Sequence, residues 1–211
     1  MEAQFWQEKW QKNEIGFHEP DVNPLLVEHI SALALEPGDR IFLPLCGKTL
    51  DIAWLLSQGY RIVGVELVEL AIEQLFAEME VEPDISSAGK MLHYQAPGID
   101  IYVGDLFDLT ADILGTVDAV YDRAAFVALP PQMREKYAAK ITEVTCSADQ
   151  LLITFEYDQS LMNGPPFSST HSDIENSYQA AYQLTLLSEG EMPGGLKGHS
   201  ADEFVWLLRQ E

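Results

Sequence analysis

The sequence has little cysteine and no long apolar run. Its two cysteines, Cys46 and Cys146, lie far apart and neither belongs to a Cys-x-x-Cys pair, so neither a disulfide framework nor a metal site is expected. This usage fits a reducing, cytoplasmic location best. No stretch approaches the roughly 18 apolar residues of a membrane span, and the N-terminus mixes charged and aromatic residues, so neither an anchor nor an export signal is predicted.

Positive charge is also scarce. Lys and Arg together number 12 against 34 Asp and Glu, which gives a formal net charge of -22. A field of this sign repels phosphate backbones and anionic lipid surfaces, so we expect no nucleic-acid and no membrane partner. The acidic residues are spread along the chain, as on a solvated surface. Because no basic or long apolar patch is apparent, a monomer is the expected state.

Phosphate-binding glycines are missing as well. The segment Gly47-Lys48-Thr49 resembles the end of a P-loop, but the position that requires the first glycine of that motif is Phe42, so the backbone cannot cradle phosphates there. A dinucleotide-binding turn needs three glycines, and only Gly47 is present near this turn. A P-loop nucleoside triphosphatase and a nicotinamide enzyme are therefore both disfavoured.

What is present is an apolar pattern typical of an α/β domain. With 211 residues, 47% hydrophobic and 10% aromatic, the chain is expected to form one domain, 1–211, with a core over 37–211. Short apolar runs alternate with stretches of helical periodicity, which favours parallel strands joined by helical crossovers. The last two runs flank a Gly-rich stretch and are expected to pair antiparallel at the edge of the sheet. The seven predicted strands are 41–45, 61–66, 99–103, 117–121, 151–155, 182–187 and 203–208.

Helices are predicted at four places, and one long segment is not assigned to regular structure. Residues 2–12 have aromatic residues at helical spacing, and three further helices are expected after Lys48 as far as Gly59, over 70–79 and over 131–144. The segment 82–98 contains prolines, glycines and serines and is interpreted mostly as loop.

Two carboxylates follow predicted strands at the edge where open parallel sheets bind ligands. Glu66 ends the second strand, about 20 residues beyond the turn after the first, where an acid accepts hydrogen bonds from ribose hydroxyls. Asp105 follows the third strand, where an adenine would lie. Each also has an ordinary structural explanation, a polar strand end for Glu66 and a turn cap for Asp105. An acid for ribose without glycines for phosphate favours a cofactor such as S-adenosylmethionine.

Several ordered motifs together make the chain resemble the thiopurine S-methyltransferase family, especially its bacterial members, over nearly its whole length. The motifs are Phe5-Trp6-x-x-Lys9-Trp10, Ile15-Gly16-Phe17-His18, Val22-Asn23-Pro24-Leu25-Leu26, Leu43-Pro44-Leu45-Cys46-Gly47-Lys48, Val63-Gly64-Val65-Glu66, Tyr121-Asp122-Arg123-Ala124-Ala125 and Gly164-Pro165-Pro166-Phe167-Ser168. The resemblance implies a Rossmann-like class I methyltransferase fold: a mostly parallel seven-stranded sheet with an antiparallel C-terminal edge, preceded by an N-terminal helical lid over residues 1–30.

The resemblance also implies a site. The residues it assigns to S-adenosylmethionine are Trp10, Leu45, Glu66, Asp105, Leu106 and Arg123. In the absence of the resemblance, the helical spacing of Trp10 would favour plain core packing. A sulfonium is attracted to aromatic faces, which suits Trp10 in a lid over the cofactor.

The acceptor side is implied to contain Phe17 and Phe167. Arg123 is the predicted catalytic residue, by contacting the cofactor, orienting water or favouring a thiolate; an ion pair with Asp122 or another acid is its structural alternative. His18 is more typical of a structural histidine than of a general base, and Lys197 has no assigned role.

The implied activity is methyl transfer from S-adenosylmethionine to the sulfur of aromatic or heterocyclic thiols such as thiopurines, with release of S-adenosylhomocysteine. Family relationships extend the expected acceptors to selenium or tellurium compounds and so to metalloid detoxification. The alternatives are a methyltransferase for another small acceptor and a non-catalytic module that binds adenosyl nucleosides.

Overall fold

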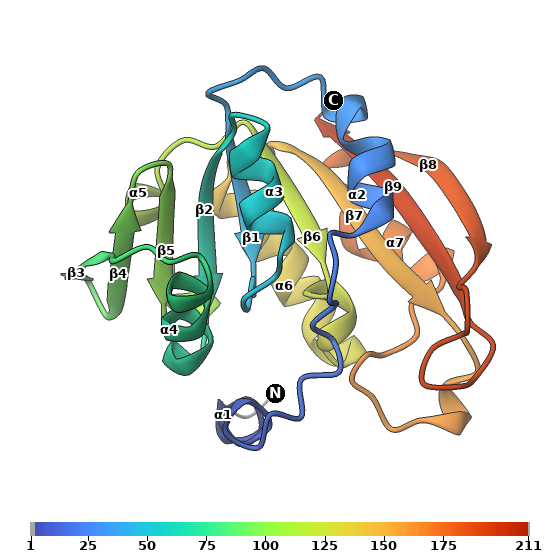
Figure 1. The fold of residues 1–211 in the computed structure, drawn as a ribbon. Coiled ribbons are helices and arrows are strands. Elements are labelled where there is room, and N and C mark those ends of the chain that lie inside the picture. The colour runs from blue at the N-terminus through green and yellow to red at the C-terminus, as the bar shows by residue number, and fades with distance from the viewer. Residues whose placement is uncertain (1–2, 211) are drawn as a thin grey trace.

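The computed structural model describes residues 3–210 (Figure 1). Residues 1, 2 and 211, which the predicted domain includes, and residue 2 of the predicted N-terminal helix lie outside this range. Nine strands within the described residues form one sheet. They are β1 (Arg40–Pro44), β2 (Arg61–Glu66), β3 (Asp84–Ala88), β4 (Met91–Ala96), β5 (Ile99–Val103), β6 (Ala119–Arg123), β7 (Asp149–Glu156), β8 (Tyr182–Glu191) and β9 (Asp202–Gln210).

The centre of the sheet is parallel and both edges are antiparallel. The strand order is β3-β4-β5-β2-β1-β6-β7-β9-β8. Strands β5, β2, β1, β6 and β7 are parallel, whereas β4 and β3 extend one edge and β9 and β8 the other in antiparallel pairing. The chain moves outward from β1 to β2 and β5, then returns to β6 on the opposite side of β1. Strand order therefore reverses at β1, and this is where open α/β sheets form their ligand crevice.

Helices cover both faces of the sheet (Figure 1). One core contains side chains of α2, η1, α3 and α4, and the other contains side chains of α5, α6 and α7. The helices are α1 (Ala3–Gln11), α2 (Pro24–His29), α3 (Asp51–Ser57), α4 (Glu69–Glu78), α5 (Ala111–Leu114), α6 (Pro131–Val144) and α7 (His171–Tyr178), with short 3-10 turns η1 (Ile30–Leu33), η2 (Leu106–Asp108), η3 (Phe126–Ala128) and η4 (Gln159–Leu161). A sheet covered on both faces explains why its central strands are continuous apolar runs.

The seven predicted strands and the antiparallel C-terminal pair are confirmed. The prediction of loop over 82–98 is wrong, because a two-strand hairpin occupies most of it and raises the number of strands to nine. Strand β6 lies two residues further along than predicted, because Asp122 and Arg123 pair with Leu152 and Ile153 of β7.

The two ends of the described chain lie at opposite ends of the strands (Figure 1). Helix α1 lies near the carboxyl ends of the parallel strands, and it contacts α4. Strand β9 runs antiparallel to β7, so it finishes beside the start of that strand, where the backbone N–H of Gln210 donates to Asp149 at 3.1 Å. Within residues 3–210, no helix combines the length and the apolarity that crossing a bilayer requires.

Gly64, in the middle of β2, marks a point of close packing in the sheet. A Cβ at this position would lie 2.8 Å from Cys46 Sγ and 2.8 Å from Ile101 Cδ1. Gly64→Ala is therefore expected to lower the free energy of unfolding by about 1–3 kcal/mol through overpacking, measured by urea denaturation. Adding Ile101→Val removes one clashing atom, so the double variant should lose less stability than the sum of the single changes. A Gly64→Ala variant as stable as the parent protein would contradict this packing.

Candidate active site

The turn after β1 lies at the point where strand order reverses. Leu45 and Gly47 both have left-handed backbone conformations, with φ of 48° and 52°, and the N–H of Cys46 donates to Val65 of β2 at 3.0 Å. A Cβ at Gly47 would come within 3.2 Å of Trp10 Cζ2. Glycine is thus favoured here twice, by its positive φ and by the indole ring packed against it.

Glu66 joins this turn to the end of β2. Its carboxylate accepts hydrogen bonds from the N–H of Gly47 and the N–H of Val68, both at 2.9 Å, and the residue is 7% exposed. Burial raises the pKa of Glu66, and these backbone N–H groups oppose the shift. Since a carboxylate offers about four acceptor positions, two bonds leave capacity for further donors such as hydroxyl groups. Glu66 therefore has both a structural set of hydrogen bonds and acceptor capacity that these bonds leave unused.

An aromatic cluster from the N-terminal segment covers this part of the site. Trp10, in α1, is 4% exposed, and its ring centroid lies 5.6 Å from that of Phe17 in an edge-to-face arrangement. Trp10 also packs with Val68 and Ala71, which lie at the start of α4, shortly after Glu66. Three predicted site residues, Trp10, Phe17 and Glu66, are thus brought to one place from separate elements.

Arg123 ends β6 and holds the N-terminal segment from the other side of β1. Its guanidinium donates to the carbonyl oxygen of Phe17 at 3.2 Å and pairs with Glu19 at 3.4 Å. The side chain is only 11% exposed, and its buried Nε has no hydrogen-bond partner among the described residues. A buried donor without an acceptor is costly. Nε of Arg123 is thus a buried donor whose hydrogen-bonding capacity the described residues leave unused.

The structural alternative considered above for Arg123, an ion pair with an acid, is met by Glu19 and not by Asp122. The carboxylate of Asp122 instead accepts from Tyr137 Oη of α6 at 2.6 Å and from the N–H of Phe126 at 3.1 Å. These bonds close the turn that follows Arg123, in which Ala124 has a φ of 68°. Asp122 therefore fixes the backbone that carries Arg123.

Asp105 and Leu106 follow β5, the other neighbour of β2. The preceding Gly104 donates its N–H to the carbonyl oxygen of Glu66 at 2.8 Å, which places this turn beside Glu66. Asp105 is exposed and accepts from the N–H of Phe107 at 2.9 Å, so its carboxylate caps the η2 turn. Leu106 is 4% exposed and packs into the core.

Phe167 lies in a loop, 164–168, that reaches the segment after Arg123. Its N–H donates to the carbonyl oxygen of Val127 in η3 at 2.7 Å. A Cβ at Gly164 would lie 2.5 Å from the Phe167 ring, so the ring is stacked on that glycine. Lys197, in the C-terminal Gly-rich stretch, donates to the carbonyl oxygen of Pro165 at 2.9 Å. The structure therefore joins Lys197 to the loop of Phe167.

His18 and Lys48 have ordinary structural environments. Burial, together with the positive charge of Lys48, lowers the pKa of His18, so the imidazole is neutral at pH 7. Lys48 forms an ion pair with Glu78 of α4. Its ammonium group therefore has a structural partner and does not act as the phosphate-binding lysine of a P-loop.

The sequence interpretation missed the residues that hold this site from α6. Tyr137 and Arg134, on the same helix, contact Asp122 and the carbonyl oxygen of Phe167 respectively. The sequence contains a sign of burial for Tyr137 but not for Arg134. The double proline before α6 predicts where the helix begins, and the spacing of Tyr137 with Ala138 and Ile141 is that of a buried helical face. No comparable pattern indicates that Arg134 is buried.

Comparisons with known proteins match the chain to one family over nearly its whole length. A model of the family described as thiopurine S-methyltransferase (TPMT) matches residues 1–206. The chain is similar to the thiopurine S-methyltransferase of Xanthobacter autotrophicus, at 50% identity over 100% of both chains, and to that of Teredinibacter turnerae, at 51% identity over 99% of this chain and 97% of the relative.

Solved structures resemble the fold at low sequence identity. A SAM-dependent methyltransferase from Anabaena variabilis superposes with a TM-score of 0.67 at 17% identity, over 99% of this chain and 95% of the other. A Burkholderia thailandensis 1,6-didemethyltoxoflavin-N1-methyltransferase, solved with S-adenosylhomocysteine, superposes with a TM-score of 0.66 at 15% identity, over 99% and 87% of the two chains. The fold is thus that of class I S-adenosylmethionine-dependent methyltransferases.

Burial raises the pKa of Asp122 to about 6 from its ordinary 3.8. The native state then holds this proton more tightly than the unfolded state, so the associated stability is present below about pH 4 and is lost as the pH rises through about 6. Asp122→Asn removes this loss. Its free energy of unfolding relative to the parent protein should therefore increase by on the order of 2–3 kcal/mol from pH 4 to pH 7, measured by urea denaturation.

Tyr137→Phe provides the matched comparison for that measurement. The Tyr137 hydroxyl lowers the pKa of Asp122, so its removal should move the loss of stability to higher pH. A relative stability of Asp122→Asn that is independent of pH would contradict the assignment.

Proposed function

Since the chain belongs to the thiopurine S-methyltransferase family, we propose that it transfers the methyl group of S-adenosylmethionine to the sulfur of aromatic or heterocyclic thiols such as thiopurines. The protein is an S-adenosylmethionine-dependent methyltransferase. The observation that carries the proposal is the position of the Glu66 carboxylate. It is buried between two backbone N–H groups where strand order reverses, with an indole ring packed on the adjoining turn.

The residues at this place fit the cofactor chemically. Glu66 retains acceptor capacity for ribose hydroxyls, and Trp10 offers an aromatic face to a sulfonium. The turn over 45–49 has no set of glycines for a pyrophosphate, and a donor without phosphates does not require one. Leu45, beside this turn, and the Asp105-Leu106 segment beside Glu66 complete the proposed cofactor site. Because Asp105 caps its own turn, we propose that this segment contributes mainly through its backbone.

When bound, S-adenosylmethionine supplies the methyl group and leaves as S-adenosylhomocysteine. The chain's own residues would hold the acceptor in line and exclude water, since charge is lost as a thiolate meets a sulfonium. Phe17 and Phe167 are proposed as the apolar walls of the acceptor side. Arg123, with its unpartnered Nε, is proposed to stabilise the thiolate or orient the bound molecules.

The proposed domain organisation and partners follow from the same reasoning. We propose a single methyltransferase domain over 1–211, with residues 1–30 as the lid segment and 37–211 as the core. Because Leu26 and Ile30 pack in one core of the sheet, the lid function is proposed for the part of this segment that precedes α2. The proposed partner is a small-molecule thiol or chalcogen acceptor, which extends to selenium or tellurium compounds because these are also soft nucleophiles. A monomeric, cytoplasmic protein that does not bind nucleic acid is proposed from its charge and cysteine content.

The first test is isothermal titration of the purified protein with S-adenosylhomocysteine, followed by a methyl-transfer assay on an aromatic thiol. We expect saturable binding and turnover, with phenols and amines of similar size methylated more slowly. Binding without transfer to any of these acceptors would indicate an adenosyl-nucleoside binding module. Faster turnover of phenols would contradict the choice of sulfur.

The role of Glu66 is tested with Glu66→Gln, which preserves the size of the side chain. The amide group replaces one acceptor oxygen with a donor that faces a backbone N–H, and the bond to ribose is weakened in every liganded state. We expect the affinity for S-adenosylhomocysteine to fall by about 10-fold or more in titration calorimetry. Glu143→Gln, at an exposed position late in α6, is the control and should bind normally. Unchanged affinity in Glu66→Gln would count against the site.

A further inference from the structure

Arg134 is a charged side chain in an unusual environment. It lies in the first turns of α6, and its side chain is only 3% exposed. Taking a charge out of water is costly unless partners satisfy it. Burial indeed lowers the pKa of Arg134, yet a guanidinium stays protonated in proteins. The contacts that compensate for this cost indicate what the residue does.

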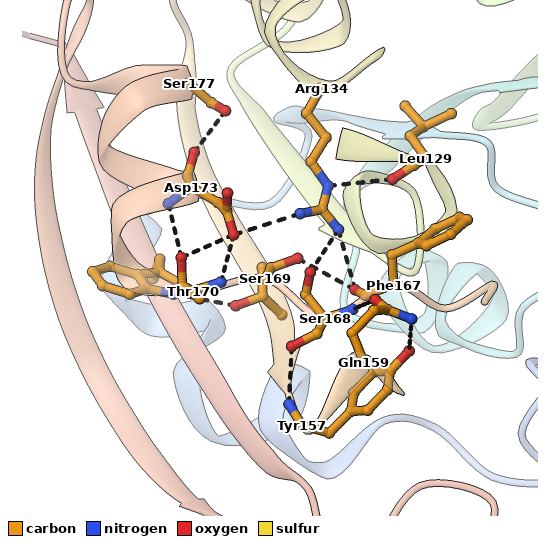
Figure 2. A network of polar contacts seen from close by, with 12 residues as sticks. Leu129, Arg134, Tyr157, Gln159, Phe167, Ser168, Ser169, Thr170, Asp173 and Ser177 are labelled. Carbon is orange, nitrogen blue, oxygen red and sulfur yellow. Dashed lines mark hydrogen bonds and ion pairs between the residues drawn. The ribbon is translucent and has the colours of Figure 1, made fainter. Parts of the chain in front are cut away.

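Two of these contacts are with backbone carbonyl groups of the loop 164–168 (Figure 2). One terminal nitrogen of Arg134 donates to the carbonyl oxygens of Phe167 at 3.1 Å and Ser168 at 3.0 Å. Nε donates to the carbonyl oxygen of Leu129 at 3.2 Å, which follows η3. The guanidinium thus joins the loop to the segment between β6 and α6.

Two further contacts fix the orientation of the guanidinium plane. Its other terminal nitrogen has no hydrogen-bond partner among the described residues and lies 3.7 Å from the carboxylate of Asp173 in α7, an ion-pair distance. Its carbon lies 4.9 Å from the centroid of the Phe126 ring, and Phe126 is the residue whose N–H binds Asp122. Because the planar fork of arginine has several donors in fixed directions, a lysine cannot reproduce this set.

The other anchors of the loop come mainly from the β7 side (Figure 2). Tyr157 donates its hydroxyl to the carbonyl oxygen of Pro166 at 2.6 Å and its N–H to Ser168 Oγ at 3.0 Å. Gln159 accepts from the N–H of Ser168 at 2.8 Å. Toward η3 and α6, the loop is held by Arg134 and by the bond between Phe167 and Val127. Loss of Arg134 would therefore loosen the loop on the side of η3 and α6, the segment that follows Arg123 in the chain.

We propose that Arg134 is a positioning residue for the methyl acceptor: it holds the loop 164–168 against the 126–129 segment and so sets where the Phe167 ring lies relative to Arg123. This inference rests on the proposed function, in which Phe167 lines the acceptor side. The proposed cofactor site comprises Trp10, Glu66, the turn after β1 and the Asp105-Leu106 segment. None of these residues, and not Arg123 either, is a partner of Arg134 in its hydrogen bonds, ion pair or ring contact. Arg134 therefore governs the affinity for the acceptor and leaves that for the cofactor unchanged.

The test is Arg134→Lys, which keeps the charge and removes the fork of donors. We expect KM for an aromatic thiol to rise by about 10-fold, the loss of a charge-assisted hydrogen bond, at saturating S-adenosylmethionine. The dissociation constant for S-adenosylhomocysteine, from titration calorimetry, should stay within about twofold. Hydrogen exchange at the amides of Phe167 and Ser168, which are hydrogen-bonded to Val127 and Gln159, should become faster, while exchange at Gly47 and Val68 stays the same.

Arg40→Lys is the matched control. Arg40 is a partly buried arginine that likewise donates to backbone carbonyls, those of Leu114 and Thr116, and pairs with Asp100. It begins β1, at the opposite end of the parallel strands from the proposed site. The Arg40→Lys substitution should lower the free energy of unfolding without changing KM for the acceptor. An equal rise of KM in Arg40→Lys would overturn the proposal, and so would an unchanged KM in Arg134→Lys.

A double-mutant cycle with Phe167→Leu tests whether Arg134 acts through that ring. If it does, the two substitutions together raise KM by less than the product of their separate effects. Fully multiplicative effects would overturn the positioning role. Absence of any methyl transfer by the unsubstituted protein would overturn the proposed function. Normal transfer together with an unchanged KM in Arg134→Lys would overturn only the positioning role.

Discussion

The carboxylate of Glu66, hydrogen-bonded to the N–H groups of Gly47 and Val68, is the interaction on which the geometry of the site depends. It links the end of β2 to the turn after β1, across the reversal of strand order. The left-handed backbone of that turn lets Trp10 pack directly on Gly47. One buried acid thus connects the sheet, the turn and the N-terminal helix. Because burial already raises its pKa, removing either N–H donor would favour its protonation and weaken all three connections.

The other half of the site is held by a helix rather than by the sheet. Two residues three positions apart in α6, Arg134 and Tyr137, face the same side of that helix. Tyr137 fixes the backbone of Arg123 through Asp122, and Arg134 fixes the loop of Phe167. The Phe126 ring lies between them, 6.3 Å from the ring of Tyr137 and 4.9 Å from the guanidinium of Arg134. A shift of α6 would therefore move both sides of the proposed acceptor site together.

The sequence predicts the features that buried strands and local motifs determine. Central strands are recognisable because both of their faces are apolar. The hairpin of β3 and β4 is not, since β3 is almost fully exposed and only Met91 and Tyr94 of β4 are buried, a spacing unlike the alternation of a half-buried strand. Arg134 stands in a helix with mixed charges, and such residues usually face water. Its burial is caused by a loop more than 30 positions further along the chain, which no local pattern can reveal.

The arrangement of the two ends of the chain has a practical consequence. Helix α1 lies near the carboxyl ends of the parallel strands, where the proposed site is, whereas β9 finishes at the opposite end of the strands, beside the start of β7 (Figure 1). A purification tag or surface linker after β9 would lie at the opposite end of the strands from Glu66 and the turn after β1. One at the N-terminus would be attached to the helix that carries Trp10. Immobilised protein for biosensor measurements should accordingly be captured through its C-terminus.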